Sequence, residues 1–503
     1  SVMFVGNPEG GAVGADGTVL TSNDAGGSWT QQNGTISSDK TWAASESPFQ
    51  VTGNILVEPG VRLTIDPGVT VKFDSDTGLQ VKGELIAQGS ATSTITFTSS
   101  AASPAAGDWT GIEFLDDSTD VVFDGSGDYV SGSIIEYAQI SYSNGLKITD
   151  SAAFLNRSTV EHSGSWGAGV QIGYTKLHNS PALPLTKVTN NIVKNSAYWG
   201  IRIDGSNYKG SLIIDNNTIT DNNTVTPDSN GGIYLNSHIS YGSDTNISVT
   251  NNTIKGPGAT GINSGDAVGT LNIENNTIEG FSSSGIYMHG YGSENQTINN
   301  NVITGNGVGI SIHPSTRNTY TITNNTLADN SRSAMRLALY GSYVVTDNVI
   351  VRNNSTEGSN YPWNDHWASA IHLYSHNYGG GAVTIKRNVI TQNSSLLNPS
   401  GTIVIENADN TDTPTFVFRD NNIFNNTSAH ELKNKRPLSI SNVDATGNWW
   451  GTTDETAIQT KIYDWNDGDA TIGVVDYSPY LSSATTTIPV SPPDGVTATP
   501  GPT

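Results

Sequence analysis

Short stretches of alternating apolar and polar residues recur along most of the chain, and turn residues separate them. Ile55 to Val57, Leu63 to Ile65 and Val69 to Phe73 alternate with Pro-Gly pairs. Alternation with a period of two residues is typical of a strand with one buried face, and Pro and Gly mark the turns between such strands. The pattern predicts an all-β chain of many short strands, which opens as a β-solenoid.

A pair of polar residues, usually two asparagines, recurs ahead of a short apolar strand. Successive copies are often about 24 residues apart, as from Asn252 to Asn276, and longer intervals indicate loop insertions. An asparagine in such a turn can adopt a left-handed bend and can bond its equivalent one coil away. We therefore expect a stacked column formed by Asn191, Asn217, Asn252, Asn276, Asn301, Asn325, Asn348, Asn388, Asn422 and Asn448.

Composition narrows the class of protein. The 503 residues carry 46 acidic and 23 basic side chains, and the net charge of −23 opposes nonspecific binding to nucleic acid or to anionic membranes. The chain has no cysteine, which excludes disulfides and thiolate metal sites, and no apolar run of transmembrane length. We expect part of a larger exported protein, extracellular or on the cell surface, without membrane insertion and without a nucleic-acid partner.

The repeats and two further segments resemble a known family. These segments are Gly107-Asp108-Trp109-Thr110-Gly111-Ile112 and the closing Gly447-Asn448-Trp449-Trp450-Gly451. They are similar to the right-handed parallel β-helix proteins of the carbohydrate-binding and sugar-hydrolase (CASH) group, and the resemblance covers about residues 45–481. It implies a right-handed parallel β-helix of about a dozen coils. Because the group mixes lyases, hydrolases, epimerases and adhesins, it implies a glycan partner without fixing a reaction.

The two ends of the chain differ from the repeats. Residues 1–36 contain Ser22, Asp24, Gly26 and Trp29 in a spacing that resembles the Asp-box hairpin of β-propeller blades. One blade cannot close a propeller, so a hairpin or cap is expected. Residues 482–503 are rich in Ser, Thr and Pro and resemble a linker leading into a fibronectin type III module. Other modules of the same larger chain are therefore expected partners.

A second repeated unit places one variable residue between two aliphatic residues, as in Gly285-Ile286-Tyr287-Met288. In a strand the two aliphatics point inward, whereas the residue between them and the residue after them point outward. Two outward columns result. The first contains Lys147, Gln171, Arg202, Tyr234, Asn263, Tyr287, Ser311, Arg336 and His372, and the second contains Asp204, Asn236, His289, His313 and Tyr374, with His238 and Tyr340 just beyond.

These columns predict a strip that contacts a polysaccharide. Coils about 4.8 Å apart would spread the strip over roughly 29 Å, the length of five or six sugar units. Tyrosine faces stack on sugar rings, and polar side chains bond sugar hydroxyls. An insertion near residue 360 is expected to form a wall beside the strip. The predicted substrate-binding residues are Arg202, Asp204, Tyr234, Asn236, His238, Tyr340, Trp363, Asp365, His366, Trp367 and Tyr374.

The strip also suggests a reaction. Lyases and epimerases that act on uronates need a base, an acid and a cation that neutralises the carboxylate. The predicted catalytic residues are Tyr287, His289, His313, Arg336 and His372. Hydrolysis needs two carboxylates about 5 to 9.5 Å apart, and the strip offers only Asp204 with Asp365 or Asp266, so this reaction ranks lower.

One cofactor and two alternatives to catalysis stay open. Because the chain is acidic, bridging Ca²⁺ is the one cofactor that a polyuronate substrate would require, but no residues are assigned to it. The same strip would also suit a noncatalytic surface adhesin or a structural stalk. The second alternative is that the strip is an ordinary polar outer face of a sheet and binds no glycan.

Overall fold

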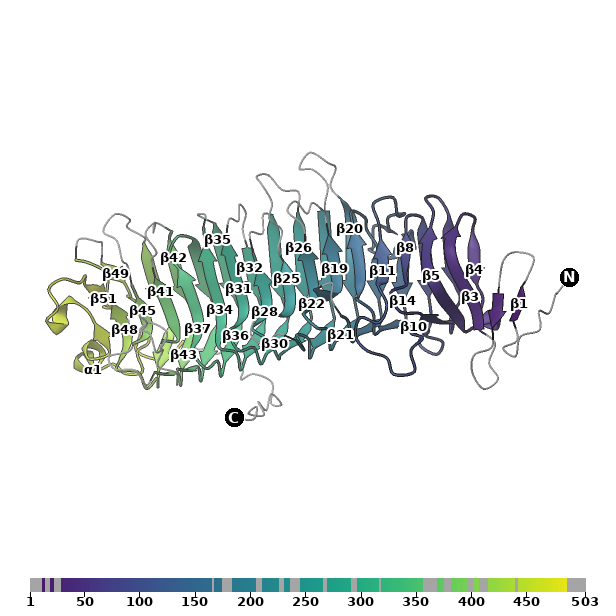
Figure 1. Ribbon diagram of the computed structural model, residues 1–503. Coiled ribbons are helices and arrows are strands. Elements are labelled where there is room, and N and C mark those ends of the chain that lie inside the picture. Colours follow the sequence, from purple (N-terminus) through teal and green to yellow (C-terminus); the bar gives the residue numbers. More distant parts are fainter. Residues whose placement is uncertain are drawn as a thin grey trace. The chain divides into compact units, whose positions relative to one another are not determined.

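The computed structural model describes residues 11–13, 19–21, 29–164, 167–173, 183–204, 210–225, 230–235, 245–265, 269–290, 296–315, 318–355, 369–374, 381–395, 401–406, 415–438 and 442–485. The chain divides into two units, Ser1–Ser248 and Val249–Thr503. Each unit is built from coils whose strands pair in parallel with the equivalent strands of the next coil (Figure 1). The predicted right-handed parallel β-helix is confirmed.

Each full coil contributes three strands, which we call row 1, row 2 and row 3 in chain order. In the first unit the row 1 strands are β4 (Lys40–Trp42), β6 (Arg62–Ile65), β9 (Glu84–Gln88), β14 (Ile134–Glu136), β17 (Phe154–Asn156), β20 (Leu183–Thr189) and β23 (Gly210–Asp215). Row 2 contains β7 (Thr70–Phe73), β10 (Ile95–Ser99), β15 (Ala138–Ser141), β18 (Thr159–Glu161), β21 (Ile192–Lys194) and β24 (Thr218–Thr220). Row 3 contains β8 (Gly78–Val81), β11 (Gly111–Phe114), β16 (Leu146–Thr149), β19 (Ala168–Gly173), β22 (Trp199–Asp204) and β25 (Gly231–Leu235), and β5 (Phe49–Val57) pairs with both β7 and β8.

The second unit repeats this arrangement after β26 (Asn246–Thr250). Its row 1 strands are β29 (Thr270–Glu274), β32 (Gln296–Asn299), β35 (Thr319–Thr323), β38 (Ser342–Thr346), β42 (Val383–Lys386), β46 (Phe416–Arg419), β49 (Val443–Asp444) and β51 (Val475–Asp476). Row 2 contains β27 (Thr253–Lys255), β30 (Thr277–Glu279), β33 (Val302–Thr304), β36 (Thr326–Ala328), β39 (Val349–Val351), β43 (Val389–Thr391) and β47 (Asn422–Phe424). Row 3 contains β28 (Thr260–Ser264), β31 (Ser284–Gly290), β34 (Val308–Pro314), β37 (Ser333–Ala338), β41 (Ile371–Tyr374), β45 (Gly401–Ile405), β48 (His430–Asn434) and β50 (Ile462–Tyr463).

The remaining elements are short. The first unit contains η1 (Ala44–Glu46) and an antiparallel pair, β12 (Val122–Phe123) with β13 (Tyr129–Ser131). The second contains α1 (Glu455–Gln459), η3 (Trp465–Asp467) and the parallel pair β40 (Asn354–Ser355) with β44 (Ser394–Ser395). Within the described ranges, no helix is long and apolar enough to cross a lipid bilayer.

The core of each unit consists of aliphatic columns. In row 3 of the second unit, one inward column contains Ile262, Ile286, Ile310, Met335 and Ile371, and each of these side chains is fully buried. Because a coil adds only a few such side chains, no coil buries its apolar face without its neighbours. Stacking of equivalent residues therefore supplies the hydrophobic stabilisation.

A column of buried amides fills the turn between rows 1 and 2. The Asn276 Oδ1 accepts from the backbone N–H of Asn252 at 2.9 Å and from its Nδ2 at 3.0 Å. The Asn276 Nδ2 in turn donates to Asn301 Oδ1 at 2.9 Å and to the Val249 carbonyl at 2.8 Å. The residue before each ladder asparagine is left-handed, as Asn275 is with a φ of 59°. The same pattern continues through Asn301, Asn325, Asn348 and Asn388 in the second unit and joins Asn191 to Asn217 in the first.

One position of this column differs from the prediction. Asn388 bonds Asn421, and Asn421 bonds Asn448, so Asn421 and not Asn422 occupies the turn. The left-handed residue is Asp420, with a φ of 60°. Asn422 is the first residue of β47 and instead exchanges hydrogen bonds with Thr485. The prediction is wrong here because Asp420-Asn421-Asn422 contains two adjacent asparagines, and the spacing of the motif fits either of them.

A second amide column lies at the turn between rows 2 and 3. Asn306, Asn330, Asn353, Asn393 and Asn426 each follow a ladder asparagine by five residues, and successive members bond through their side chains at 2.8 to 3.2 Å. In the first unit, Asn222 Oδ1 accepts from the Ser196 backbone in the same way. Both ends of the row 2 strands β33, β36, β39, β43 and β47 are therefore fixed by buried amides.

The N-terminal strands are β1 (Gly11–Val13), β2 (Val19–Thr21) and β3 (Trp29–Ile36). They pair antiparallel in the order β1–β2–β3, and β3 continues in parallel onto β5. Ser22, Asp24 and Gly26 of the predicted Asp-box turn lie outside the described residues, so this assignment stays a prediction. The same holds for most of the predicted linker, because the description ends at residue 485.

Replacing Asn276 by Ala should destabilise the second unit by roughly 1 to 3 kcal/mol, because buried amide and carbonyl partners lose their bonds. The loss should be measured as the change in free energy of unfolding in urea. Asn275→Gly is the matched control, since the Asn275 side chain is exposed and glycine tolerates its left-handed backbone. Equal stability of the two variants would contradict a structural role for the ladder.

Candidate functional site

The row 3 strands of the second unit bring predicted site residues into register. Tyr287 of β31 pairs with Ser311 of β34, Ser311 with Arg336 of β37, and Arg336 with His372 of β41. His289 pairs with His313 one coil further on. Because neighbouring strands lie about 4.8 Å apart, residues far apart in sequence have side chains in contact.

His313 is the centre of these contacts. Its Nε2 lies 3.0 Å from the Ser311 Oγ and 3.2 Å from the Tyr374 Oη, and its Nδ1 also bonds that oxygen. Its ring lies 5.5 Å from the Tyr287 ring, which also contacts the His289 ring at 5.1 Å. Both imidazole nitrogens are thus held by hydroxyl groups, which fixes the orientation of the ring.

Arg336 provides a positive charge beside this group. Its guanidinium lies over the Tyr374 ring, 4.8 Å from the ring centre. Burial lowers the pKa of Arg336, and the nearby Tyr374 and Tyr287 oppose that change. Burial also raises the pKa of both tyrosines, which the charge of Arg336 partly counteracts. At neutral pH both phenols are therefore protonated and the guanidinium is charged.

A partly buried ionic group also supports Tyr374. The His372 ring stacks on the Tyr374 ring at 5.1 Å, and its Nε2 lies 3.2 Å from Glu406 Oε2. The other Glu406 oxygen, Oε1, is 2.6 Å from Lys435 Nζ. This chain of contacts holds the phenol of Tyr374 against His313.

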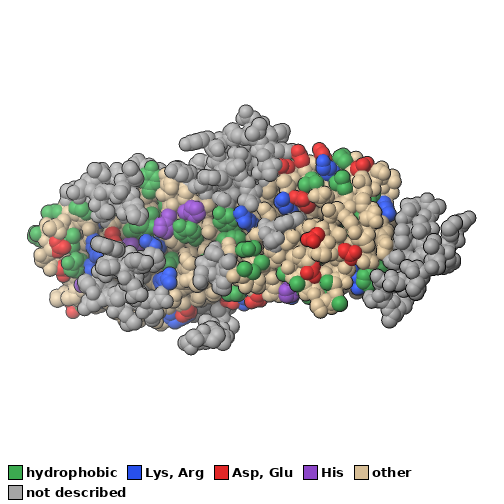
Figure 2. Space-filling model, in the orientation of Figure 1, with side chains coloured by type: hydrophobic (Ala, Val, Ile, Leu, Met, Phe, Trp, Pro, Cys, Tyr) green, Lys and Arg blue, Asp and Glu red, His purple; other side chains and the backbone are tan. Residues whose placement is uncertain are grey.

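One part of the expected geometry is wrong. The five predicted catalytic residues were all expected to lie on the strip that contacts a polysaccharide, but His372 is only 1 % exposed. Tyr374, predicted to bind substrate, is also buried. Tyr287, His313 and Arg336 are partly buried, and His289 is exposed. Histidine side chains reach the surface beside hydrophobic and cationic side chains on the face that Figure 2 shows. Of the five predicted catalytic residues, Tyr287, His289, His313 and Arg336 therefore keep side-chain surface that is open to solvent.

Sequence reasoning missed Glu406 and Lys435. Glu406 and Lys435 each come directly after the second inward residue of a row 3 strand, which is the position that His313 and Tyr374 also occupy. The strand pairing shows this equivalence, because Ile405 pairs with Leu373 on one side and with Asn434 on the other. The signal was present: Thr402-Ile403-Val404-Ile405 is one more copy of the row 3 unit, and Glu406 stands at its outward position.

The other predicted residues have different outcomes. In the first unit, Arg202 lies over the Tyr234 ring at 5.6 Å, and Trp199 stacks on Tyr234 at 5.1 Å. Tyr340 is partly buried just after β37, and the side chain of Asp204 is not described. Outside the described residues lie Asn236, His238, Asp266, Trp363, Asp365, His366 and Trp367.

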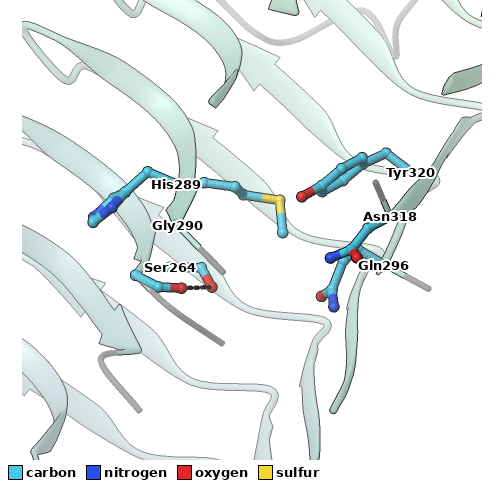
Figure 3. A pocket seen from close by; sticks show the side chains of 8 residues that line it. Ser264, His289, Gly290, Gln296, Asn318 and Tyr320 are labelled. Atoms are coloured by element: carbon cyan, nitrogen blue, oxygen red, sulfur yellow. Dashed lines mark hydrogen bonds between the residues drawn. The ribbon is translucent and has the colours of Figure 1, made fainter. Parts of the chain in front are cut away.

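A small cavity lies behind His289. It has a volume of about 10 Å³, close to the least that holds one water molecule. In Figure 3 the His289 ring points away from the cavity, whereas Gln296, Asn318 and Tyr320 line its far side. Burial raises the pKa of Tyr320 to about 12. Among the described residues, no three His, Asp or Glu side chains are grouped to hold a metal ion.

Fold and site together define the class: a right-handed parallel β-helix with a cationic and aromatic strip on one row of strands. Two protein-family models match the sequence. The family model described as "Right handed beta helix region" matches residues 237–413, and the one described as "Pectate-lyase like beta helix domain" matches residues 34–170.

The chain is similar to several known proteins. Protein bark beetle of Drosophila melanogaster is 42 % identical over 92 residues, which are 17 % of this chain and 3 % of that protein. Among solved structures, a double mutant of the periplasmic alginate epimerase AlgG has a TM-score of 0.45 at 12 % identity, covering 79 % of this chain and 85 % of that one. The A-module of the Azotobacter vinelandii mannuronan C-5 epimerase AlgE4 has a TM-score of 0.36 at 11 % identity, covering 63 % and 84 %. These likenesses concern the fold.

Replacing Tyr374 by Phe should give a stability difference that depends on pH. The pKa of Tyr374 is raised in the folded state, so its stabilising contribution is complete below the unfolded pKa of about 10 and decreases as pH rises above it. A phenylalanine at this position has no such titration. The melting temperature of the wild type should therefore exceed that of Tyr374→Phe at pH 8, and the gap should narrow by pH 11. A gap that stays constant would contradict the burial of a neutral phenol.

Proposed function

We propose that the second unit binds an acidic polysaccharide along its row 3 strands and catalyses proton transfer at the carbon next to a uronate carboxylate. The reaction is C5 epimerisation or β-elimination, outside the cell or at its surface. The observation that carries this proposal is the contact of Arg336 with Tyr374 and of Tyr374 with His313. A cation, a phenol and an imidazole from three coils thus form one cluster.

Arg336 is the group that suits the carboxylate. Its planar guanidinium can bond both carboxylate oxygens, and its charge stabilises the negative charge that develops when the C5 proton leaves. Partial burial strengthens this effect, because the local dielectric is lower than that of water. Without such a cation, removing a proton beside a carboxylate would place two negative charges next to each other.

His313 is the candidate base. In the tautomer with its proton on Nδ1, it donates to the Tyr374 oxygen, and Nε2 accepts a proton from the substrate once the Ser311 hydroxyl turns away from it. The C5–H bond then breaks, an N–H bond forms at Nε2, and the electron pair passes to the carboxylate-stabilised intermediate. Tyr374 is a positioning residue in this scheme, since its buried ring is held by contacts with both Arg336 and His372.

Tyr287 is the candidate acid. Burial raises its pKa, so its phenol carries a proton at neutral pH, and its ring lies next to that of His313. Donation of that proton to the leaving glycosidic oxygen, as the C4–O bond breaks, completes elimination. Return of a proton to C5 from the opposite face completes epimerisation instead. The exposed His289 is assigned to contacts with the glycan.

His313→Ala should lower turnover of polyuronates roughly 10²- to 10⁴-fold while binding is retained, because an acid-base group is lost. Arg336→Ala should weaken binding of an acidic polysaccharide much more than that of a neutral one. Turnover is followed by absorbance of unsaturated products and by NMR of C5 configuration. Arg352→Asn is the control, since Arg352 is exposed, is paired with Asp329 at a turn of the same unit and has a left-handed backbone that asparagine tolerates.

Two outcomes would contradict the proposal. Binding without turnover on a broad panel of uronic and neutral polysaccharides would favour an adhesin or a stalk. If alanine at Tyr287, His289, His313, Arg336 and His372 together leaves glycan binding unchanged, the strip is an ordinary polar sheet face.

A further inference from the structure

The first unit carries a separate groove over its row 1 strands. The hairpin β12–β13 packs on β17 through aromatic contacts: the Phe123 ring meets the Phe154 ring edge-on at 5.2 Å, and the Tyr129 ring faces it at 6.4 Å. Lys187 fastens the hairpin, because its Nζ donates to the Gly127 carbonyl at 2.5 Å and lies over the Phe123 ring. The hairpin is therefore held in place.

The groove beside this hairpin has a volume of about 440 Å³. That volume is within the range of roughly 300 to 1,000 Å³ of typical small-molecule sites. Tyr129 and Phe154 supply partly exposed aromatic surface, and the Tyr129 hydroxyl donates to the Gly132 carbonyl at 2.8 Å, which fixes its ring. One wall is thus rigid and aromatic.

A polar row forms the floor of the groove. Parallel pairing places Glu136, Asn156, Thr189 and Asp215 side by side on β14, β17, β20 and β23. Asn156 Nδ2 donates to Glu136 at 2.7 Å, and its Oδ1 accepts from Thr189 at 3.0 Å and from the Asn190 amide at 2.8 Å. These groups are oriented before any ligand arrives, which lowers the entropic cost of binding.

The charges of the groove are largely balanced. Arg157 pairs with Glu136 at 2.8 Å, and Lys187 lies in the same lining as Asp128 and Asp215. The polar row offers amides, a hydroxyl and carboxylates, so it provides both the donors and the acceptors that sugar hydroxyls require. The aromatic wall suits the apolar faces of pyranose rings. A strongly charged ligand would leave one sign of charge uncompensated.

We infer that this groove is a second glycan-binding site, specific for neutral oligosaccharides and independent of the chemistry proposed for the second unit. It anchors the protein on a neutral chain. Tyr129 and Phe154 pack against sugar rings, and Arg157, Asn190 and Asp215 bond hydroxyls.

The test is isothermal titration of the full chain with cellohexaose, xylohexaose, mannohexaose and laminarihexaose. At least one should bind, and Tyr129→Ala should weaken that binding roughly fivefold through loss of stacking surface. Arg157→Asn should also weaken it. Arg157 is exposed and left-handed, so asparagine tolerates its backbone. Arg387→Asn is the matched control: it changes an exposed, left-handed arginine paired with Asp347 at the corresponding turn of the second unit.

The groove variants should leave binding and turnover of acidic polysaccharides unchanged, and His313→Ala should bind the neutral hexasaccharide as the wild type does. Failure of the proposed reaction would therefore not affect this result. The inference is overturned if none of the four hexasaccharides binds, or if Arg157→Asn and Arg387→Asn bind them equally.

Discussion

The buried amide ladder is the interaction on which the rest of the structure depends. From Asn252 to Asn448, an asparagine in the turn between rows 1 and 2 bonds the backbone and side chain of its equivalent one coil away, so these buried amides are paired without water. The left-handed residue before it sets the bend. Because the two ladders hold both ends of the row 2 strands from β33 to β47, the register of these coils is fixed independently of loop length.

This constraint explains how the chain tolerates insertions while keeping a site. The interval from Asn348 to Asn388 is 40 residues, and the interval from Asn353 to Asn393 is also 40. The extra residues must therefore lie outside the ladder turns and row 2, between Asn353 and Asn388. Arg336 and His372 consequently remain paired across adjacent strands although 36 residues separate them. A functional cluster can then be assembled one residue per coil.

The sequence predicted what depends on periodicity and could not predict what depends on packing. Alternation and asparagine spacing gave the fold and the row of Tyr287, Arg336 and His372. The shift at Asn422 arose because the repeated motif cannot distinguish two adjacent asparagines, whereas the left-handed backbone at Asp420 can. Burial of His372 depends on the ring of Tyr374, which lies at another position of the same strand, and on Glu406, which comes from the next coil. The groove under β12–β13 depends on a hairpin outside the repeat.

A structure of the His313→Ala chain with a uronate tetrasaccharide tests the central claim most directly, which is that side chains aligned by coil stacking form one acidic-glycan site. The account predicts a uronate carboxylate within hydrogen-bond distance of the Arg336 guanidinium, with the C5 carbon of that sugar facing the position of the missing imidazole. A tetrasaccharide bound with no carboxylate at Arg336, or bound away from the row 3 strands, would contradict it.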